Sequence, residues 1–251
     1  MLFVVRIFEI KLMLKILNII KYIRKILTSW IPNFSKDFLR MIREYELQGI
    51  IKQFPKNCEI LEIGGGSGWQ ANIMKNMGFN VYSVDIKGSE YFDEKIFNVQ
   101  VYDGINLPFN DKKFDLIFSS NVLEHITLLD KLQSEIHRVL KDDGIAVHIL
   151  PSSSWRLWTI FTDIIKFWRF TKPHGEHATN VFYEIFYFKI NWWKKSFIKN
   201  KWEIFKIIPN KLFYTGNLIL GKKLTIQKRK LLSLILGSSC NIYFLKKKSK
   251  N

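Results

Sequence analysis

The chain has 251 residues, 47% of them apolar, and carries a formal charge of +17. This length and composition allow one sizeable core, which excludes an intrinsically disordered protein. The positive charge allows two interpretations: a nucleic-acid or membrane partner, or a bias toward Lys, Ile, Asn and Phe with no partner behind it. Cys58 and Cys240 form no C-x-x-C pair, so the sequence contains neither a disulfide framework nor a zinc motif and favours a reduced cytoplasmic setting.

Residues 1–34 predict a basic amphipathic helix ahead of the domain. Its apolar runs are too short to span a bilayer, and Arg6 and Glu9 interrupt the place where a signal peptide would have its apolar centre. Polar and aliphatic side chains occupy opposite faces: Lys11, Lys15, Asn18, Lys21 and Lys25 against Leu12, Ile16, Ile19, Ile20, Ile23 and Leu27. Such a helix either lies in an anionic membrane surface or packs on its own domain. We therefore expect a cytoplasmic protein, with peripheral contact to the inner face of the membrane through residues 1–30 as one of the two alternatives.

From residue 59 to about 150, β-like runs alternate with helical patterns, which is typical of βαβ units around a parallel sheet. The expected strands are 59–63, 80–84, 97–102, 113–119 and 145–150, and the expected helices are 67–77 and 127–140. Asp142-Asp143-Gly144 is expected to end the second helix. Beyond Pro151, a stretch rich in Trp, Phe and Tyr predicts a helix over about 154–170, a turn at 172–175 and a further helix to about 199. Two last strands follow, at 202–208 and 242–246, with a basic insertion between them.

The stretch ILEIGGGSGWQA, residues 60–71, places glycines between the first strand and a helix. Glycines there let backbone N–H groups and the helix N-terminus approach a ligand closely. A dinucleotide fingerprint, G-x-G-x-x-G, starting at Gly64 would need a third glycine where Trp69 stands. The pattern is instead Glu62-x-Gly64-x-Gly66-x-Gly68, with an acidic residue two positions before the first glycine.

This E-x-G-x-G-x-G pattern resembles motif I of the class I S-adenosylmethionine-dependent methyltransferases. The segments LPFNDKKFDLIFSSNVLEHI (107–126) and EIHRVLKDDG (135–144) resemble the "LPF…FD…NVLEH" and "RVLKPGG" segments of the subfamily that methylates small molecules and lipids. The resemblance implies a Rossmann-like, doubly wound α/β fold. Its mostly parallel seven-stranded sheet would have helices on both faces and an antiparallel last strand, together with the N-terminal helix and an aromatic-rich helical insertion. Residues 35–251 would form a single methyltransferase domain, with a cofactor-binding half at 58–150 and acceptor-side elaborations at 151–251.

The resemblance also implies S-adenosylmethionine as the cofactor and a set of residues that hold it. Gly64, Gly65, Gly66 and Gly68 would lie against its amino-acid and ribose parts, and Asn121 would meet its methionine part. Asp85, 21 residues after Gly64 and followed by Ile86, is placed to accept both ribose hydroxyls. Asp103 and Gly104 would lie near the adenine. Glu62 either contacts the cofactor's amino group, the role we assign to it, or braces the turn.

Methyl transfer needs alignment of acceptor and methyl group and, for an alcohol or phenol, removal of a proton, so the histidines are the candidate bases. His125, at the mouth of the fourth strand, is the first choice. His174 and His177, in the polar loop KPHGEH, are placed to cap the acceptor pocket, and no metal site is expected.

The leading hypothesis for the function is O-methylation of a small-molecule, lipid or surface-glycan intermediate. The alternatives are a nucleic-acid methyltransferase and a non-catalytic cofactor-binding module at a membrane surface. The segment SSNVLEH differs from the N/D-P-P-Y of amino-methylating DNA and RNA enzymes, and no Pro-Cys pair supplies a cytosine nucleophile, so a nucleic-acid partner is disfavoured.

Overall fold

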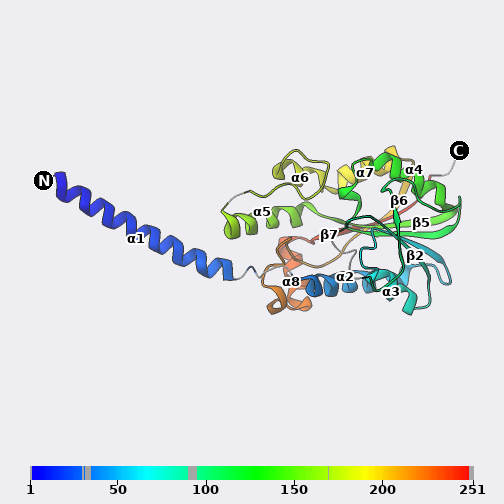
Figure 1. The fold of residues 1–251 in the computed structure, drawn as a ribbon, viewed down its shortest axis with the longest axis horizontal. Helices are drawn as coiled ribbons and strands as arrows, with labels where there is room; N and C mark the ends of the chain where they lie inside the picture. The colour runs from blue at the N-terminus through cyan, green and yellow to red at the C-terminus, as the bar shows by residue number, and fades with distance from the viewer. Residues whose placement is uncertain (1, 30, 32–34, 90–94, 169, 249–251) are drawn as a thin grey trace.

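The computed structural model describes residues 2–29, 31, 35–89, 95–168 and 170–248 (Figure 1). The side chains of residues 2–12, 14 and 24 are not among those described, so the expected faces of Lys11 and Leu12 lie outside the described residues. The helices are α1 (Leu2–Ser29), α2 (Lys36–Ile50), α3 (Trp69–Asn76), α4 (Leu129–Val139), α5 (Ser153–Phe167), α6 (Val181–Tyr187), α7 (Ile190–Lys199) and α8 (Ile226–Leu236). The strands are β1 (Glu59–Ile63), β2 (Asn80–Ile86), β3 (Val99–Tyr102), β4 (Phe114–Ser120), β5 (Leu140–Pro151), β6 (Trp202–Pro209) and β7 (Cys240–Lys247).

Seven strands form one sheet in the order β3-β2-β1-β4-β5-β7-β6. β1 pairs in parallel with β2 and β4, and β2–β3 and β4–β5 are parallel as well. β7 runs antiparallel to both of its neighbours, β5 and β6. The predicted doubly wound sheet with an antiparallel last strand is therefore confirmed. The central strands end side by side, with Ile63 of β1 opposite Val84 of β2 and Ser119 of β4, so the loops that follow them meet at one edge.

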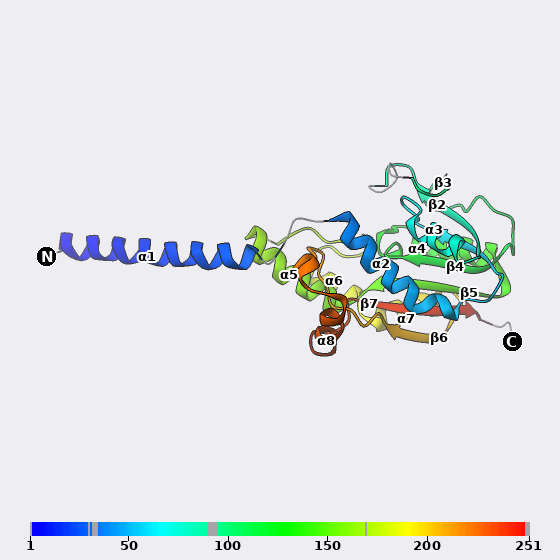
Figure 2. The ribbon, with the colours of Figure 1, turned by 90° about the horizontal axis from the view of Figure 1, so that it is seen from below.

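Helices cover both faces of the sheet, as Figures 1 and 2 show. Because strand side chains alternate between faces, Leu116 and Phe118 of β4 pack with α2 and α3, whereas Ile117 packs with α4 and α7. The polar Ser35 caps the start of α2 by accepting a hydrogen bond from the Phe38 N–H at 3.3 Å. The helix then buries Phe38, Ile42 and Leu47 against the sheet.

The helix ends at Val139, ahead of Asp142-Asp143-Gly144, but the expected strand start at residue 145 is wrong because β5 already begins at Leu140 and includes these three residues. Phe114 of β4 pairs with Leu140 of β5, and Leu116 pairs with Ile145. Between these two pairs the chain advances two positions along β4 and five along β5. The excess bulges out of the ladder, which accommodates the Asp-Asp-Gly sequence without ending the strand.

The prediction of a single helix between the 172–175 turn and residue 199 is also wrong, since two helices, α6 and α7, occupy this segment. Lys189, between α6 and α7, has extended backbone angles (φ −68°, ψ 142°), which interrupt the helix. The break lets Phe188 pack into the core on the α2 face while Trp193 and Phe197 of α7 pack on the opposite face. A straight helix could not reach both cores.

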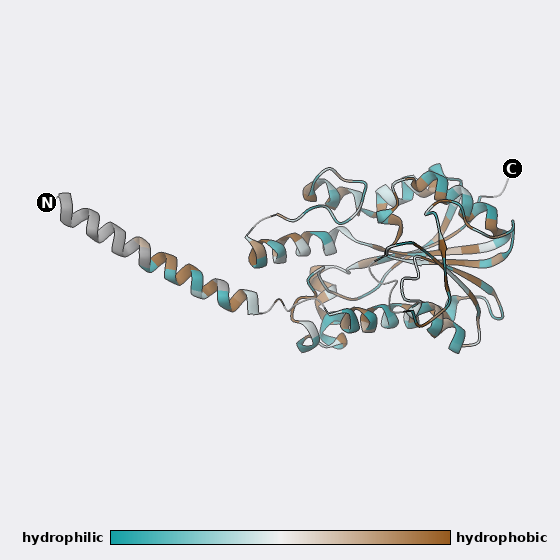
Figure 3. Cartoon of the chain, viewed as in Figure 1, coloured by the Kyte–Doolittle hydropathy of each residue, from teal (hydrophilic) through white to brown (hydrophobic). Residues whose placement is uncertain are grey.

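Helix α1 extends away from the sheet and meets α5 near its own C-terminal end (Figures 1 and 2). Apolar and polar residues alternate along its coloured part in Figure 3. Among the residues that the structure describes, every helix is too short or too polar to cross a bilayer. The predicted N-terminal helix thus exists, and most of it lacks a partner within the chain's described part.

Candidate active site

A cleft of about 800 Å³ opens where β1, β2 and β4 end. This volume lies in the range of small-molecule sites, and the position matches the crevice beyond the carboxyl ends of parallel strands where open α/β sheets bind ligands. Residues from separate segments, from α2 to the segment after β6, line it. They include Arg43, Gly64, Gly66, Asp85, Ile86, Tyr102, Asn121, His125, Trp155, Arg156, Asp163, Phe167, His174 and Tyr214.

The glycine turn forms one wall of this cleft. Gly64 has φ +75°, and a Cβ there would collide with the side chain of Val122, so only glycine lets the turn lie against the loop after β4. The Gly64 and Gly65 N–H groups both donate to the Val84 carbonyl of β2, at 2.8 and 3.1 Å. Gly68 begins α3 with φ +79°. Gly64 and Gly66 therefore present backbone to the cleft, whereas Gly65 and Gly68 shape the turn behind it.

Asp85 lies at the end of β2 and is 7% exposed. Its Oδ2 accepts a hydrogen bond from the Gly66 N–H at 2.6 Å, and its Oδ1 accepts one from the Ile86 N–H at 2.7 Å. The carboxylate thus holds the glycine turn and faces the cleft at the same time. Each oxygen retains a lone pair, so Asp85 fits the expected role of accepting ribose hydroxyls.

Glu62 lies beneath the turn and is not among the residues that line the cleft. Its Oε2 accepts a hydrogen bond from the Ser83 hydroxyl at 2.6 Å. Burial raises the pKa of this carboxyl to about 7, although the bonds from Ser83 and from the Ala71 backbone act in the opposite direction. Of the two roles left open by the sequence, this position favours bracing of the turn.

Asp103 and Gly104 are also not among the residues that line the cleft, although Tyr102 just before them is. Asp103 Oδ1 accepts hydrogen bonds from the N–H groups of Ile105 and Asn106 at 2.8 and 2.7 Å, and its Oδ2 accepts one from the Asn106 amide at 2.6 Å. The Asn106 side chain and these backbone groups hold the pKa of Asp103 below its ordinary value. The exposed carboxylate therefore caps the turn after β3.

Asn121 follows β4 in the left-handed region, with φ +55°. Its N–H donates to the Ile149 carbonyl at 2.8 Å, which fixes the backbone, and its side-chain amide donates to the Ser120 hydroxyl at 3.3 Å. The residue lines the cleft in the same loop as Val122, against which Gly64 packs, and His125.

The structure brings two of the three candidate histidines together. His125 and His174 both line the cleft, and their ring centroids are 4.6 Å apart. The protein atoms around His174 lower its pKa to about 3, with smaller contributions from His125 and two arginines, so this imidazole is neutral and a weak base. His177 lies outside the cleft, where its Nε2 is 3.4 Å from the Leu123 carbonyl oxygen and its ring packs on Trp192.

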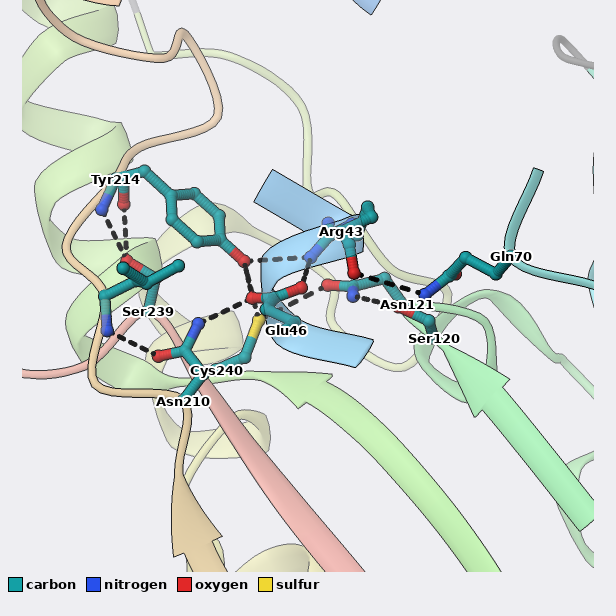
Figure 4. Close-up of polar contacts among 10 residues, drawn as sticks. Arg43, Glu46, Gln70, Ser120, Asn121, Asn210, Tyr214, Ser239 and Cys240 are labelled. Atoms are coloured by element: carbon teal, nitrogen blue, oxygen red, sulfur yellow. Dashed lines mark hydrogen bonds and ion pairs between the residues drawn. The ribbon is translucent and has the colours of Figure 1, made fainter. Parts of the chain in front are cut away.

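Sequence reasoning missed a buried network beside the cleft (Figure 4). Arg43 of α2 donates to Glu46 Oε2 at 2.7 Å and to the Tyr214 hydroxyl at 2.9 Å, and that hydroxyl donates to Glu46 Oε1 at 2.8 Å. Burial raises the pKa of Tyr214 well above its ordinary value, so its hydroxyl stays protonated. Arg43 and Tyr214 are 171 positions apart, so no local sequence pattern pairs them.

The sheet order, the glycine turn and Asp85 at the end of the second strand define the fold and cofactor cleft of a class I S-adenosylmethionine-dependent methyltransferase. Comparisons with known proteins agree. A family model described as "Methyltransferase domain" matches residues 61–148. A solved S-adenosylmethionine-dependent methyltransferase from Mesorhizobium loti superimposes with a TM-score of 0.55 at 14% identity, covering 81% of this chain and 98% of that one, which establishes likeness of fold.

Three curated relatives match over shorter spans. An uncharacterized protein of Methanocaldococcus jannaschii is 28% identical over 57% of this chain and 67% of its own. The sarcosine/dimethylglycine N-methyltransferase of Aphanothece halophytica is 30% identical over 40% of each chain. The ubiquinone biosynthesis O-methyltransferase of Rickettsia prowazekii is 24% identical over 47% of this chain and 52% of its own. The chain thus spans about half the length of the latter two. It carries a class I S-adenosylmethionine-dependent methyltransferase domain, and S-adenosylmethionine is the cofactor of that domain.

Proposed function

We propose that the protein transfers the methyl group of S-adenosylmethionine to a hydroxyl oxygen of a small-molecule, lipid or glycan intermediate. The observation that carries the proposal is a single cleft lined both by Gly64, Gly66 and Asp85 and by His125 and His174. The cofactor side is the part that matches the family, and the opposite side supplies polar groups of the kind that a hydroxyl acceptor needs.

When bound, the sulfonium supplies an electrophilic methyl carbon. Asp85 then orients the ribose, and the exposed backbone at Gly64 and Gly66 lets the cofactor lie close to β1. Asn121, between the cofactor side and His125, directs the methyl group toward the acceptor. An acceptor hydroxyl placed against His125 would form the new oxygen–methyl bond as the sulfur–methyl bond breaks. S-adenosylhomocysteine would leave, and the hydroxyl proton would pass to the His125 imidazole, whose side chain is 39% exposed, and from there to solvent.

The acceptor side is partly apolar, which supports an acceptor with an apolar portion. Trp155 packs its ring on His174, with centroids 4.8 Å apart, and Phe167 lines the cleft at the end of α5. Arg156 and Asp163, both nearly buried, add charge of each sign to the same wall. This mixture fits an amphiphilic molecule better than a fully polar one.

The end of the molecule that carries α1 supports a lipid or lipid-linked acceptor at a membrane surface. Helices α5 and α8 lie at this end in both ribbon views, and the Trp158 indole N–H of α5 donates to the Leu236 carbonyl of α8 at 3.0 Å. Large apolar side chains are exposed on all three helices: Ile16, Ile19 and Ile23 of α1, Leu157, Phe161 and Ile164 of α5, and Leu231, Leu234 and Ile235 of α8. Lysines alternate with them along α1, an arrangement that favours anionic lipid headgroups.

The test of the function is release of S-adenosylhomocysteine in the presence of lipid, glycan and small-molecule fractions, with transfer of a labelled methyl group to identify the acceptor. We expect one fraction to accept the label on oxygen. Label on nitrogen would contradict the choice of acceptor atom. Binding of S-adenosylmethionine without turnover in any fraction would favour the non-catalytic module, and no binding by calorimetry would refute the proposal altogether.

Membrane contact is tested separately by flotation with anionic vesicles. The full chain with Lys15, Lys21 and Lys25 changed to Glu is compared with a variant of equal net charge, in which Lys52, Lys56 and Lys131, all outside α1, α5 and α8, are changed to Glu. We expect only the first variant to stop floating with the vesicles, because each basic residue near an anionic surface contributes about 1 kcal/mol to membrane binding. Equal recovery of the two variants would refute contact through α1.

A further inference from the structure

Three potential metal ligands meet on the acceptor side of the cleft. One ligand atom each from Glu124, His125 and His174 lies within 4.8 Å of the other two. Glu124 and His125 come from the short helical turn after β4, and His174 comes from the loop between α5 and α6. Two imidazole nitrogens and one carboxylate oxygen form a common ligand set for divalent transition metals.

Glu124 lacks the partners that a buried carboxylate needs. Its side chain is fully buried, and neither carboxylate oxygen has a hydrogen-bond donor among the described residues. The ion pair with His125 spans 3.9 Å between Oε1 and Nε2, which is too long for a hydrogen bond. Because an ionised carboxylate buried without a donor is costly, this group is explained best by a cation that joins it when the site is filled.

The position of His174 is fixed by surrounding structure. The Glu176 N–H donates to the Glu124 carbonyl at 2.9 Å, and a Cβ on Gly175 would approach that carbonyl oxygen to 2.6 Å. Glu184 Oε1 accepts hydrogen bonds from the N–H groups of His174 and Gly175 at 2.7 and 2.5 Å.

Glu184 itself is held by Arg156, with 2.5 Å between Oε2 and Nε, and both side chains are almost completely buried. Glu176, Gly175 and Glu184 thus press the loop onto the Glu124 backbone. Such support around ligand residues is what orients them toward a metal.

We propose that Glu124, His125 and His174 bind one divalent transition-metal ion, and that its remaining coordination positions hold oxygen atoms of the methyl acceptor. Three protein ligands leave open positions, as in catalytic rather than structural sites. His125 then serves as a metal ligand instead of the general base expected from the sequence, and the ion would lower the pKa of a bound acceptor hydroxyl so that its proton is lost to solvent. The role toward the acceptor rests on the proposed function, whereas binding of the ion does not.

The test uses the full-length protein and Co²⁺ as the probe, because Co²⁺ bound by histidine and carboxylate gives visible absorption bands. We expect the parent to bind about one Co²⁺ and Zn²⁺ to displace it, in line with the greater affinity of such sites for Zn²⁺. His125→Gln and His174→Gln should each weaken binding at least about 100-fold, the upper limit for loss of residues that only support a ligand. His177→Gln is the matched control, since this histidine belongs to the same loop but not to the cluster, and it should bind as the parent does.

Affinity for S-adenosylmethionine, measured by calorimetry on each variant, shows whether the cofactor side remains folded. Glu124→Gln is a third variant. If the protein does not fold with this substitution in a buried position, His125→Gln tests the metal site instead, because the His125 side chain is 39% exposed. Absence of Co²⁺ bands in the parent, or equal binding by the parent, His125→Gln and His174→Gln, would overturn the metal site. A parent that binds Co²⁺ but transfers no methyl group would instead contradict the proposed function.

Discussion

Asp85→Ala provides the sharpest test of the cofactor side. The change removes the acceptor of two backbone hydrogen bonds, from Gly66 at 2.6 Å and from Ile86 at 2.7 Å, and the expected partner of the ribose hydroxyls. A hydrogen bond to a charged group contributes about 1.5–3 kcal/mol. Since water replaces part of the loss, we expect about 3 kcal/mol, or roughly a hundredfold higher Kd for S-adenosylmethionine. Asp85→Asn keeps one acceptor oxygen and should lie between the two.

Asp103→Ala is the matched comparison, because the sequence assigned both carboxylates to the cofactor and the structure separates them. Asp103 is exposed and bonds its own turn, so we expect its removal to raise the Kd by no more than about tenfold. Isothermal calorimetry measures both values, and thermal melting establishes that each variant is folded. Equal losses for the two variants, or an Asp85→Ala protein that binds within about threefold of the parent, would refute the assignment.

Three further changes test the structure around the cleft. Gly64→Ala places a Cβ against Val122 in a left-handed backbone conformation, whereas a Cβ at Gly78, with φ +92°, meets no atom within 4 Å. Urea unfolding should therefore find Gly64→Ala less stable than Gly78→Ala by about 1–3 kcal/mol. Equal stabilities would contradict the clash. Glu184→Gln leaves Arg156 buried beside a neutral partner and should cost about 3–5 kcal/mol in urea unfolding; a loss below about 1 kcal/mol would show that the ion pair is unimportant. The pKa of Glu62 is about 7 in the folded state against an ordinary value of 4.5. Between these pH values the folded protein therefore binds more protons than the unfolded chain. As a result, the free energy of unfolding falls by up to about 3 kcal/mol as the pH rises from 4.5 to 7. Glu62→Gln should flatten this slope in urea unfolding at pH 5 and 7.5, and an unchanged slope would contradict the burial of an ionisable group there.

The cofactor half was predictable because its chemistry is local in sequence. A glycine turn follows its strand directly, and an acidic residue at the end of the next strand must stand beside it once the two strands pair in parallel. Gly64, Gly66 and Asp85 therefore reach the cleft as expected. Which carboxylate faces the ligand is a different question, decided by side-chain partners such as Ser83 for Glu62 and Asn106 for Asp103. The spacing contains no information about those partners.

The acceptor half was predicted poorly because long-range contacts build it. Arg43 belongs to a helix that precedes the first strand and reaches the cleft through Glu46 and Tyr214. His174 stands beside His125 only because Glu184, ten residues further along the chain, accepts the N–H groups of its loop. Of the two histidines in the KPHGEH loop, the sequence could not tell which one faces the cleft, since the direction of each ring depends on where the loop docks.

The division between the two halves decides what the relatives can say about the acceptor. The family match ends at residue 148, and most acceptor-side residues lie outside it, including Arg43, Trp155, Arg156, His174 and Tyr214. Relatives whose names specify transfer to nitrogen or to oxygen each match less than half of this chain, so their names do not decide the acceptor atom. The acceptor must therefore be argued from this chain's own wall of the cleft. A partly apolar wall beside the His125–His174 pair, at the end of the molecule where α1, α5 and α8 expose apolar side chains, favours a hydroxyl on an amphiphile over a free polar metabolite.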